Sequence, residues 1–75
     1  MRLEKGEFGV FPLDNEGFEI ASLRYAENKK QAVAMAKRYV QNKELIVAGL
    51  YKVEVRNHRE EIVADFFVKQ EVNHV

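Results

Sequence analysis

Residues 28–42 read NKKQAVAMAKRYVQN, and this stretch decides the fold because it carries the strongest helical pattern in the chain. Asn28 is a favourable N-cap, and Gln31 three positions later completes a capping box of the N-x-x-Q kind. The apolar residues recur at the i, i+3, i+4 spacing of one helix face: Ala32, Val33, Ala36, Tyr39 and Val40. The pattern predicts a helix whose small alanines allow it to lie close to a sheet.

A β-hairpin is predicted before this helix. Residues 7–13 (EFGVFPL) and 18–25 (FEIASLRY) are strand patterns, and they flank the turn sequence Asp14-Asn15-Glu16-Gly17. That sequence is typical of a type I turn followed by a glycine with positive φ. Because Pro12 has no N–H to donate, we expect the first strand to lie at an edge of the sheet.

A second hairpin is predicted after the helix. Residues 44–56 (ELIVAGLYKVEVR) form the strongest strand pattern, and residues 61–72 (EIVADFFVKQEV) form its partner. The whole chain, residues 1–75, is therefore predicted to be a single α+β domain with the order β-β-α-β-β. We expect a four-stranded, mostly antiparallel sheet with the one helix packed on one face. If the second and third strands are neighbours, they are parallel and joined by a right-handed crossover.

The register of the second hairpin follows from its charges. A four-residue loop pairs Arg56 with Glu61 and Lys52 with Asp65. A two-residue turn would instead set Glu54 opposite Glu61, and like charges directly opposite each other destabilise a sheet. The pattern favours the longer loop.

Composition excludes several classes of protein. The chain has 75 residues, 47% of them hydrophobic, and 12 basic side chains balance 12 acidic ones. A net charge of zero gives no global field toward nucleic acid or an anionic membrane. The absence of cysteine excludes a disulfide scaffold and thiolate metal sites. No signal peptide or membrane span is visible in this sequence, so we expect residence in the cytoplasm.

Catalytic and metal-binding patterns are sparse. Ser22 is the only serine, the chain has no threonine, and the two histidines are His58 and His74. No second metal ligand of a suitable type lies at close spacing from either histidine. We therefore expect no enzyme activity, no catalytic residue, no metal and no cofactor.

The face of the sheet away from the helix is predicted to be unusually apolar. From the second hairpin it carries Ile46, Leu50, Val63 and Phe67, and a soluble monomer rarely leaves a large apolar patch bare. We therefore expect a small non-enzymatic protein–protein interaction module. It associates as a homodimer through this sheet face or through an edge strand, or it binds another protein. The alternative is that sheet twist and residues 69–75 cover these side chains.

The middle third of the chain is basic, and this supports an alternative function. Residues 21–45 hold six basic and two acidic side chains. Lys30, Lys37 and Arg38 lie on the polar side of the predicted helix and are candidate phosphate-binding residues. A solubilising helix face would carry the same charges, so nucleic-acid binding is the second hypothesis.

Two stretches of the chain resemble known families. The stretch Asn28-Lys29-Lys30-Gln31-Ala32 resembles the start of the last helix of double-stranded RNA-binding domains, where a Lys-Lys pair meets RNA phosphates. The chain continues into a hairpin and has no preceding helix, so we do not assign it to that family. Residues 25–47 resemble small β-β-α-β modules of plasmids and phages, which implies an accessory protein of a mobile element.

Overall fold

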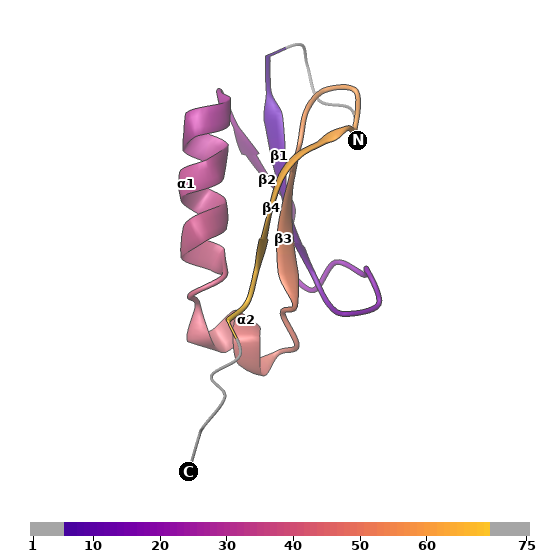
Figure 1. Cartoon of the computed structure of the whole chain (residues 1–75), viewed down its shortest axis with the longest axis vertical. Coiled ribbons are helices and arrows are strands. Elements are labelled where there is room, and N and C mark those ends of the chain that lie inside the picture. The colour runs from indigo at the N-terminus through magenta and orange to yellow at the C-terminus, as the bar shows by residue number, and fades with distance from the viewer. Residues whose placement is uncertain (1–5, 70–75) are drawn as a thin grey trace.

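The described part of the chain, residues 6–69 of this computed structural model, forms a four-stranded antiparallel sheet with one main helix on it. Every neighbouring pair of strands is antiparallel, in the order β2-β1-β3-β4, and the helix α1 covers one face (Figure 1). The predicted α+β architecture is confirmed. The elements in chain order are β1 (Phe8–Leu13), β2 (Arg24–Ala26), α1 (Lys29–Tyr39), α2 (Lys43–Val47), β3 (Lys52–Arg56) and β4 (Ile62–Phe67).

The helix α1 begins as the capping pattern predicts. The Asn28 side chain accepts a hydrogen bond from the backbone N–H of Gln31 at 2.9 Å. The Gln31 side chain reaches back to the N–H of Glu27 at 3.2 Å, one residue before the N-cap. The first bond satisfies an N–H of the first helical turn, which has no partner within the helix. The second satisfies an N–H just before the N-cap.

The core lies between α1 and the two central strands. Ala32 and Ala36 are fully buried on the helix, and they belong to one cluster with Val10, Val53 and Val55 of the sheet. Two alanines one turn apart bring the helix backbone close to the sheet, as predicted. The close approach leaves room only for small side chains at these two positions.

The prediction that β1 is an edge strand is wrong. β1 lies between β2 and β3 and pairs with both. The Pro12 carbonyl accepts from the Ile20 N–H at 3.1 Å, so the backbone of Pro12 faces the β2 side of β1. β2 is three residues long and pairs only with Phe8–Val10. The β1–β2 ladder therefore ends before Pro12 and needs no N–H from it.

The first hairpin is less regular than predicted. Its turn forms as expected: Gly17 has a φ of 88°, and Gly17 N–H donates to the Asp14 carbonyl at 3.1 Å. The predicted strand over residues 18–25 is reduced to an isolated bridge at Glu19 and to β2. The turn reaches out on the side of the sheet opposite α1 (Figure 1).

The predicted strand over residues 44–56 is wrong in its first half, which forms the helix α2. Asn42 caps it by accepting from the N–H of Leu45 at 3.1 Å. At its end the N–H of Leu50 donates to the Leu45 carbonyl and that of Gly49 to the Ile46 carbonyl. These two bonds define a Schellman motif, with Gly49 in the left-handed region at a φ of 111°.

Replacing Gly49 with alanine is therefore expected to destabilise the fold by about 1–2 kcal/mol, because a side chain with a Cβ is strained at this positive φ. Space is not the cause, since a Cβ at Gly49 would meet nothing within 4 Å. Urea denaturation followed by circular dichroism measures the change. An unaltered midpoint would contradict the helix end and favour the strand that the sequence suggested.

The second hairpin has a different register from the predicted one. Glu54 pairs with Asp65 and Val53 with Phe66, with a bulge at Val63. The turn is built around Asn57, whose side chain accepts from the N–H groups of Arg59 and Glu61. Glu54 tolerates Asp65 opposite it because Lys52 and Arg56, on the same strand as Glu54, already neutralise its charge. Residues 70–72 of the predicted strand lie outside the described residues.

Candidate functional site

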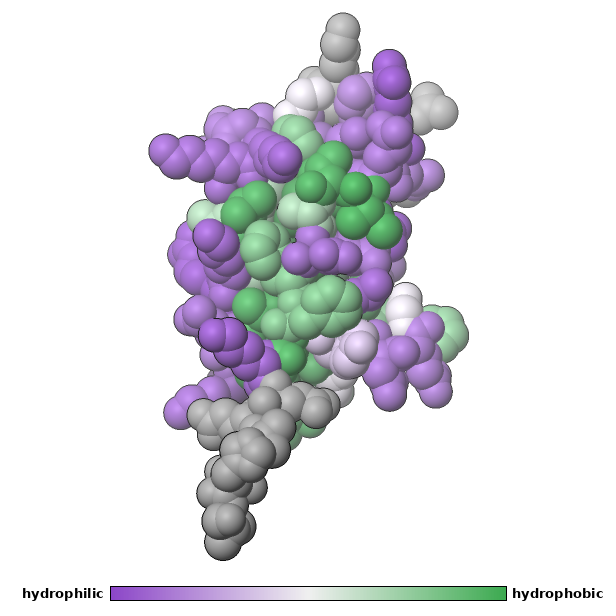
Figure 2. Space-filling view, in the orientation of Figure 1, coloured by the Kyte–Doolittle hydropathy of each residue, from purple (hydrophilic) through white to green (hydrophobic). Residues whose placement is uncertain are grey.

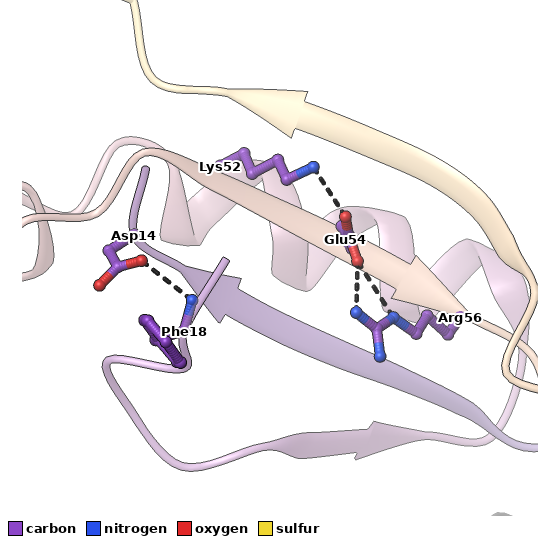
Figure 3. A network of polar contacts seen from close by, with 5 residues as sticks. All are labelled: Asp14, Phe18, Lys52, Glu54 and Arg56. Carbon is purple, nitrogen blue, oxygen red and sulfur yellow. Dashed lines mark hydrogen bonds and ion pairs between the residues drawn. The ribbon is translucent and has the colours of Figure 1, made fainter. Parts of the chain in front are cut away.

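The sheet face turned away from α1 is crossed by a ladder of charges on β3. Lys52, Glu54 and Arg56 alternate with the buried Val53 and Val55, so their side chains share this face. Lys52 Nζ lies 2.8 Å from Glu54 Oε2, and Arg56 Nη2 lies 2.6 Å from Glu54 Oε1 (Figure 3). Glu54 is only 4% exposed at the centre of the ladder. Both of its carboxylate oxygens are thus engaged.

Aromatic rings flank the ladder on both neighbouring strands. The Arg56 guanidinium lies over the Phe11 ring of β1, 4.2 Å from its centroid. The Lys52 ammonium lies 5.8 Å from the centroid of Phe67 on β4, whose ring meets Tyr51 edge-on at 5.5 Å. Cations over ring faces are attracted by the ring quadrupole. The face is therefore a mixed charged and aromatic surface, in place of the apolar one predicted.

The contacts within the ladder hold Glu54 and Lys52 in their charged forms. Burial disfavours the charged carboxylate of Glu54, but hydrogen bonds from Lys52 and Arg56 outweigh burial and keep its pKa below the ordinary value of 4.5. The hydrogen bond to Glu54 raises the pKa of Lys52 above 10.5. Neither group exchanges a proton near neutral pH, so the ladder suits structure and recognition better than acid–base chemistry.

The four predicted interface residues are not brought together on one sheet face. Leu50 is only 5% exposed and belongs to the core on the helix side, which corrects its predicted position on the outer face. Ile46 lies on α2, because the residues around it form a helix instead of a strand. Val63 is the bulged residue and packs partly against the core, whereas Phe67 is half exposed on β4.

The free edge of β4 is a feature that the sequence reasoning did not single out. β4 is six residues long, and among residues 6–69 it pairs with β3 alone. Ile62 is 53% exposed and Phe67 50% exposed. Figure 2 shows apolar side chains gathered over this side of the molecule, bordered by charged ones. The sequence signal was the run IVADFF, in which one charged residue interrupts apolar residues of high β-propensity.

The predicted phosphate-binding residues lie on two sides of α1. Lys30 and Lys37 border a shallow hollow on α1 with Lys29, Val33 and Ala34. Arg38 instead shares a hollow with Arg24, Met35 and Tyr39 on the β2 side. The structure therefore separates Arg38 from the two lysines with which it was grouped.

Metal-binding clusters are not seen in the part of the chain that the structure describes. Among residues 6–69, no three His, Asp or Glu side chains lie close enough to hold a metal ion. His58 lies in the turn between β3 and β4, and His74 falls outside the described residues. Within the same range, no helix is long and apolar enough to cross a membrane.

Comparison with known proteins adds no relative. No protein family, no curated protein and no solved structure matches the chain. Any statement of function must therefore come from the surfaces described above.

Proposed function

We propose that this chain is a non-enzymatic protein–protein interaction module that forms a homodimer by pairing β4 with β4 of a second copy. Exposed edge strands are templates for strand addition, and soluble proteins usually protect them with proline, lysine, bulges or a covering segment. β4 contains no proline, glycine or lysine, its bulge lies at its first residues only, and Asp65 is its one charged residue. Among residues 6–69 no further strand pairs with this edge, and this observation carries the proposal.

The other edge of the sheet is a poor template by comparison. β2 is three residues long, Arg24 is its first residue, and Glu27 follows its last. A two-fold β4–β4 contact uses the same surface on both copies and therefore closes. The short β2 edges leave little strand to continue the sheet, so we expect a dimer with eight strands and no longer assembly. Cytoplasmic residence belongs to the same proposal, and it agrees with a chain that has no cysteine.

The side chains favour one antiparallel register. The Val68 N–H donates to the carbonyl of Tyr51, the residue before β3, at 3.0 Å, so the backbone groups of Val68 face β3. Because successive residues of a strand point these groups to opposite sides, the N–H and C=O groups of Asp65 and Phe67 point to the free edge. Pairing Asp65 with Asp65 of the second copy would set two like charges opposite each other. Pairing Asp65 with the second copy's Phe67 avoids this repulsion and brings the second copy's Lys69 to a diagonal position beside Asp65. Phe66 then lies opposite Phe66 of the second copy, on the helix side of the joined sheet.

The decisive test uses proline at position 65. Asp65→Pro removes an N–H that points to the free edge and leaves the β3–β4 ladder bonds in place, so it should abolish dimerisation without unfolding the chain. Asp65→Ala is the matched control, because it removes the same carboxylate and keeps the N–H. Light scattering on a sizing column, over about a hundredfold concentration range, gives the mass of each protein.

We expect a concentration-dependent dimer for the unmodified chain and for Asp65→Ala, with the alanine variant modestly weaker because it loses the contact to Lys69. For Asp65→Pro we expect a monomer at every concentration. An unmodified chain that stays monomeric throughout, or a proline variant that dimerises as well as the alanine variant, would contradict pairing through β4.

A further inference from the structure

The exposed surface of α1 carries positive charge only. Its sequence KKQAVAMAKRY contains four basic residues and no acidic one, although the chain as a whole is neutral. Successive helix residues are rotated by about 100°. Met35 and Arg38 share a hollow with Arg24 of β2, so they mark the flank of α1 on the β2 side. Val33 lies two residues before Met35, about 200° around the helix, and lines the hollow with the lysines on the opposite flank. This flank is on the β4 side, because β2 and β4 are at opposite edges of the sheet.

We infer that the β4-paired dimer binds single-stranded nucleic acid in a trough between its two α1 helices, lined by Lys29, Lys30 and Lys37 of both copies. The inference rests on the proposed dimer, because one copy supplies only one wall. A two-fold axis through the β4–β4 contact places both helices on the same face of the joined sheet. It also runs the two walls in opposite directions, so that each end of the trough receives lysines.

The dimensions of the joined sheet suit one strand. α1 packs over β1 and β3, so four strand spacings of about 4.8 Å separate the two helix axes by roughly 19 Å. A helix with its side chains is about 10 Å wide, which leaves a trough about 9 Å across. Such a trough admits a single polynucleotide strand, whereas a duplex could touch only the tops of its walls.

The floor of the trough adds no opposing charge. The helix side of β4 presents Ala64 and Phe66, which pair with the buried Val55 and Val53. Asp65 alternates with them and points to the other face. Apart from Asp65, the acidic side chains nearest to α1 and β4 in the sequence lie outside these two elements: Glu27, Glu44, Glu60 and Glu61. Polyanion backbones are held in grooves that combine cationic walls with an apolar or aromatic floor.

A charge reversal on adjacent residues tests the inference. Lys37→Glu changes the trough, and Arg38→Glu makes the same change in the same last turn of α1 but on the β2 side. Fluorescence anisotropy with labelled single-stranded DNA and RNA oligonucleotides, and with a duplex of the same sequence, reports binding. Thermal melts of both variants check that they fold.

We expect Lys37→Glu to weaken single-strand binding at least about tenfold and Arg38→Glu to change it less than about threefold, since a screened charge outside the trough contributes little. If three to six lysines contact phosphates, log affinity should fall against log salt with a slope of about −2 to −4. Asp65→Pro should lose at least about tenfold in affinity, because a monomer offers half the charges.

Several outcomes overturn the inference. A dimer that binds no single-stranded oligonucleotide overturns it and leaves the proposed dimerisation intact. Equal effects of Lys37→Glu and Arg38→Glu, undiminished binding by monomeric Asp65→Pro, or tighter binding of duplex than of single strand also overturn it. A chain that never dimerises removes both proposals, and the mass measurement shows this independently of any oligonucleotide.

Discussion

Ala36→Leu is expected to lower the free energy of unfolding by about 2–3 kcal/mol, because it forces extra carbon atoms into a packed helix–sheet contact. Ala36 is completely buried and lies in one cluster with Val10, Val53 and Val55. The surrounding strands are central in the sheet, so they cannot move aside without losing ladder hydrogen bonds. For a domain of this size the melting temperature should fall by roughly 10–20 °C.

Ala34→Leu is the matched control, since it makes the same change on the exposed side of the same helix. We expect its stability to stay within about 0.5 kcal/mol of that of the unmodified chain. Urea titration and thermal melts of the two variants, read by circular dichroism, give the comparison. Equal stability of Ala36→Leu and Ala34→Leu would mean that α1 does not lie against the sheet as described.

The correct predictions rest on signals that are local in the sequence. The cap at Asn28, the alanine face of α1 and the Asp14–Gly17 turn each depend on residues within a few positions of one another. Such patterns specify an element without reference to the rest of the chain. They were enough to give the class of the fold and the order of its strands and main helix, without α2.

The wrong predictions share a different cause. The edge position of β1 was inferred from Pro12 alone, but strand order depends on the pairing of β1 with β3, which are far apart in the sequence. Pro12 is compatible with a central strand only because β2 stops short of it, and no local pattern shows where β2 stops.

The helix α2 was missed because hydrophobic alternation was weighed above capping. Leu45, Ile46 and Val47 suit a strand, yet Asn42 before them and Gly49 after them are an N-cap and a C′ residue at the spacing of a short helix. Asn42 and Gly49 together predict this short helix, and a helix here takes Leu50 off the outer face of the sheet. Of the candidate surface, only Val63 and Phe67 were placed on the strand that now carries the proposal.

Glu54→Gln is expected to cost about 1–3 kcal/mol at neutral pH, because the amide keeps the size of the side chain but loses its charge-assisted hydrogen bonds. One end of the amide also places a donor against Lys52 or Arg56, which are themselves donors only. Glu19→Gln is the matched control, because it makes the same change at an exposed position of the first hairpin, away from β4 and the charge ladder. This neutralisation should change stability by less than about 0.5 kcal/mol.

The cost of Glu54→Gln should depend on pH in a definite direction. The folded-state pKa of Glu54 lies below 4.5, so in the acid range the unfolded chain binds more protons at this carboxyl than the folded chain does. The stability that Glu54 contributes is therefore complete above its ordinary pKa, and it is lost as the pH falls through the lowered folded-state pKa. Urea denaturation of both proteins at about pH 7 and in steps down to about pH 3 should show their stabilities converging. A difference that stays constant over this range would mean that the Glu54 carboxylate is not held by Lys52 and Arg56.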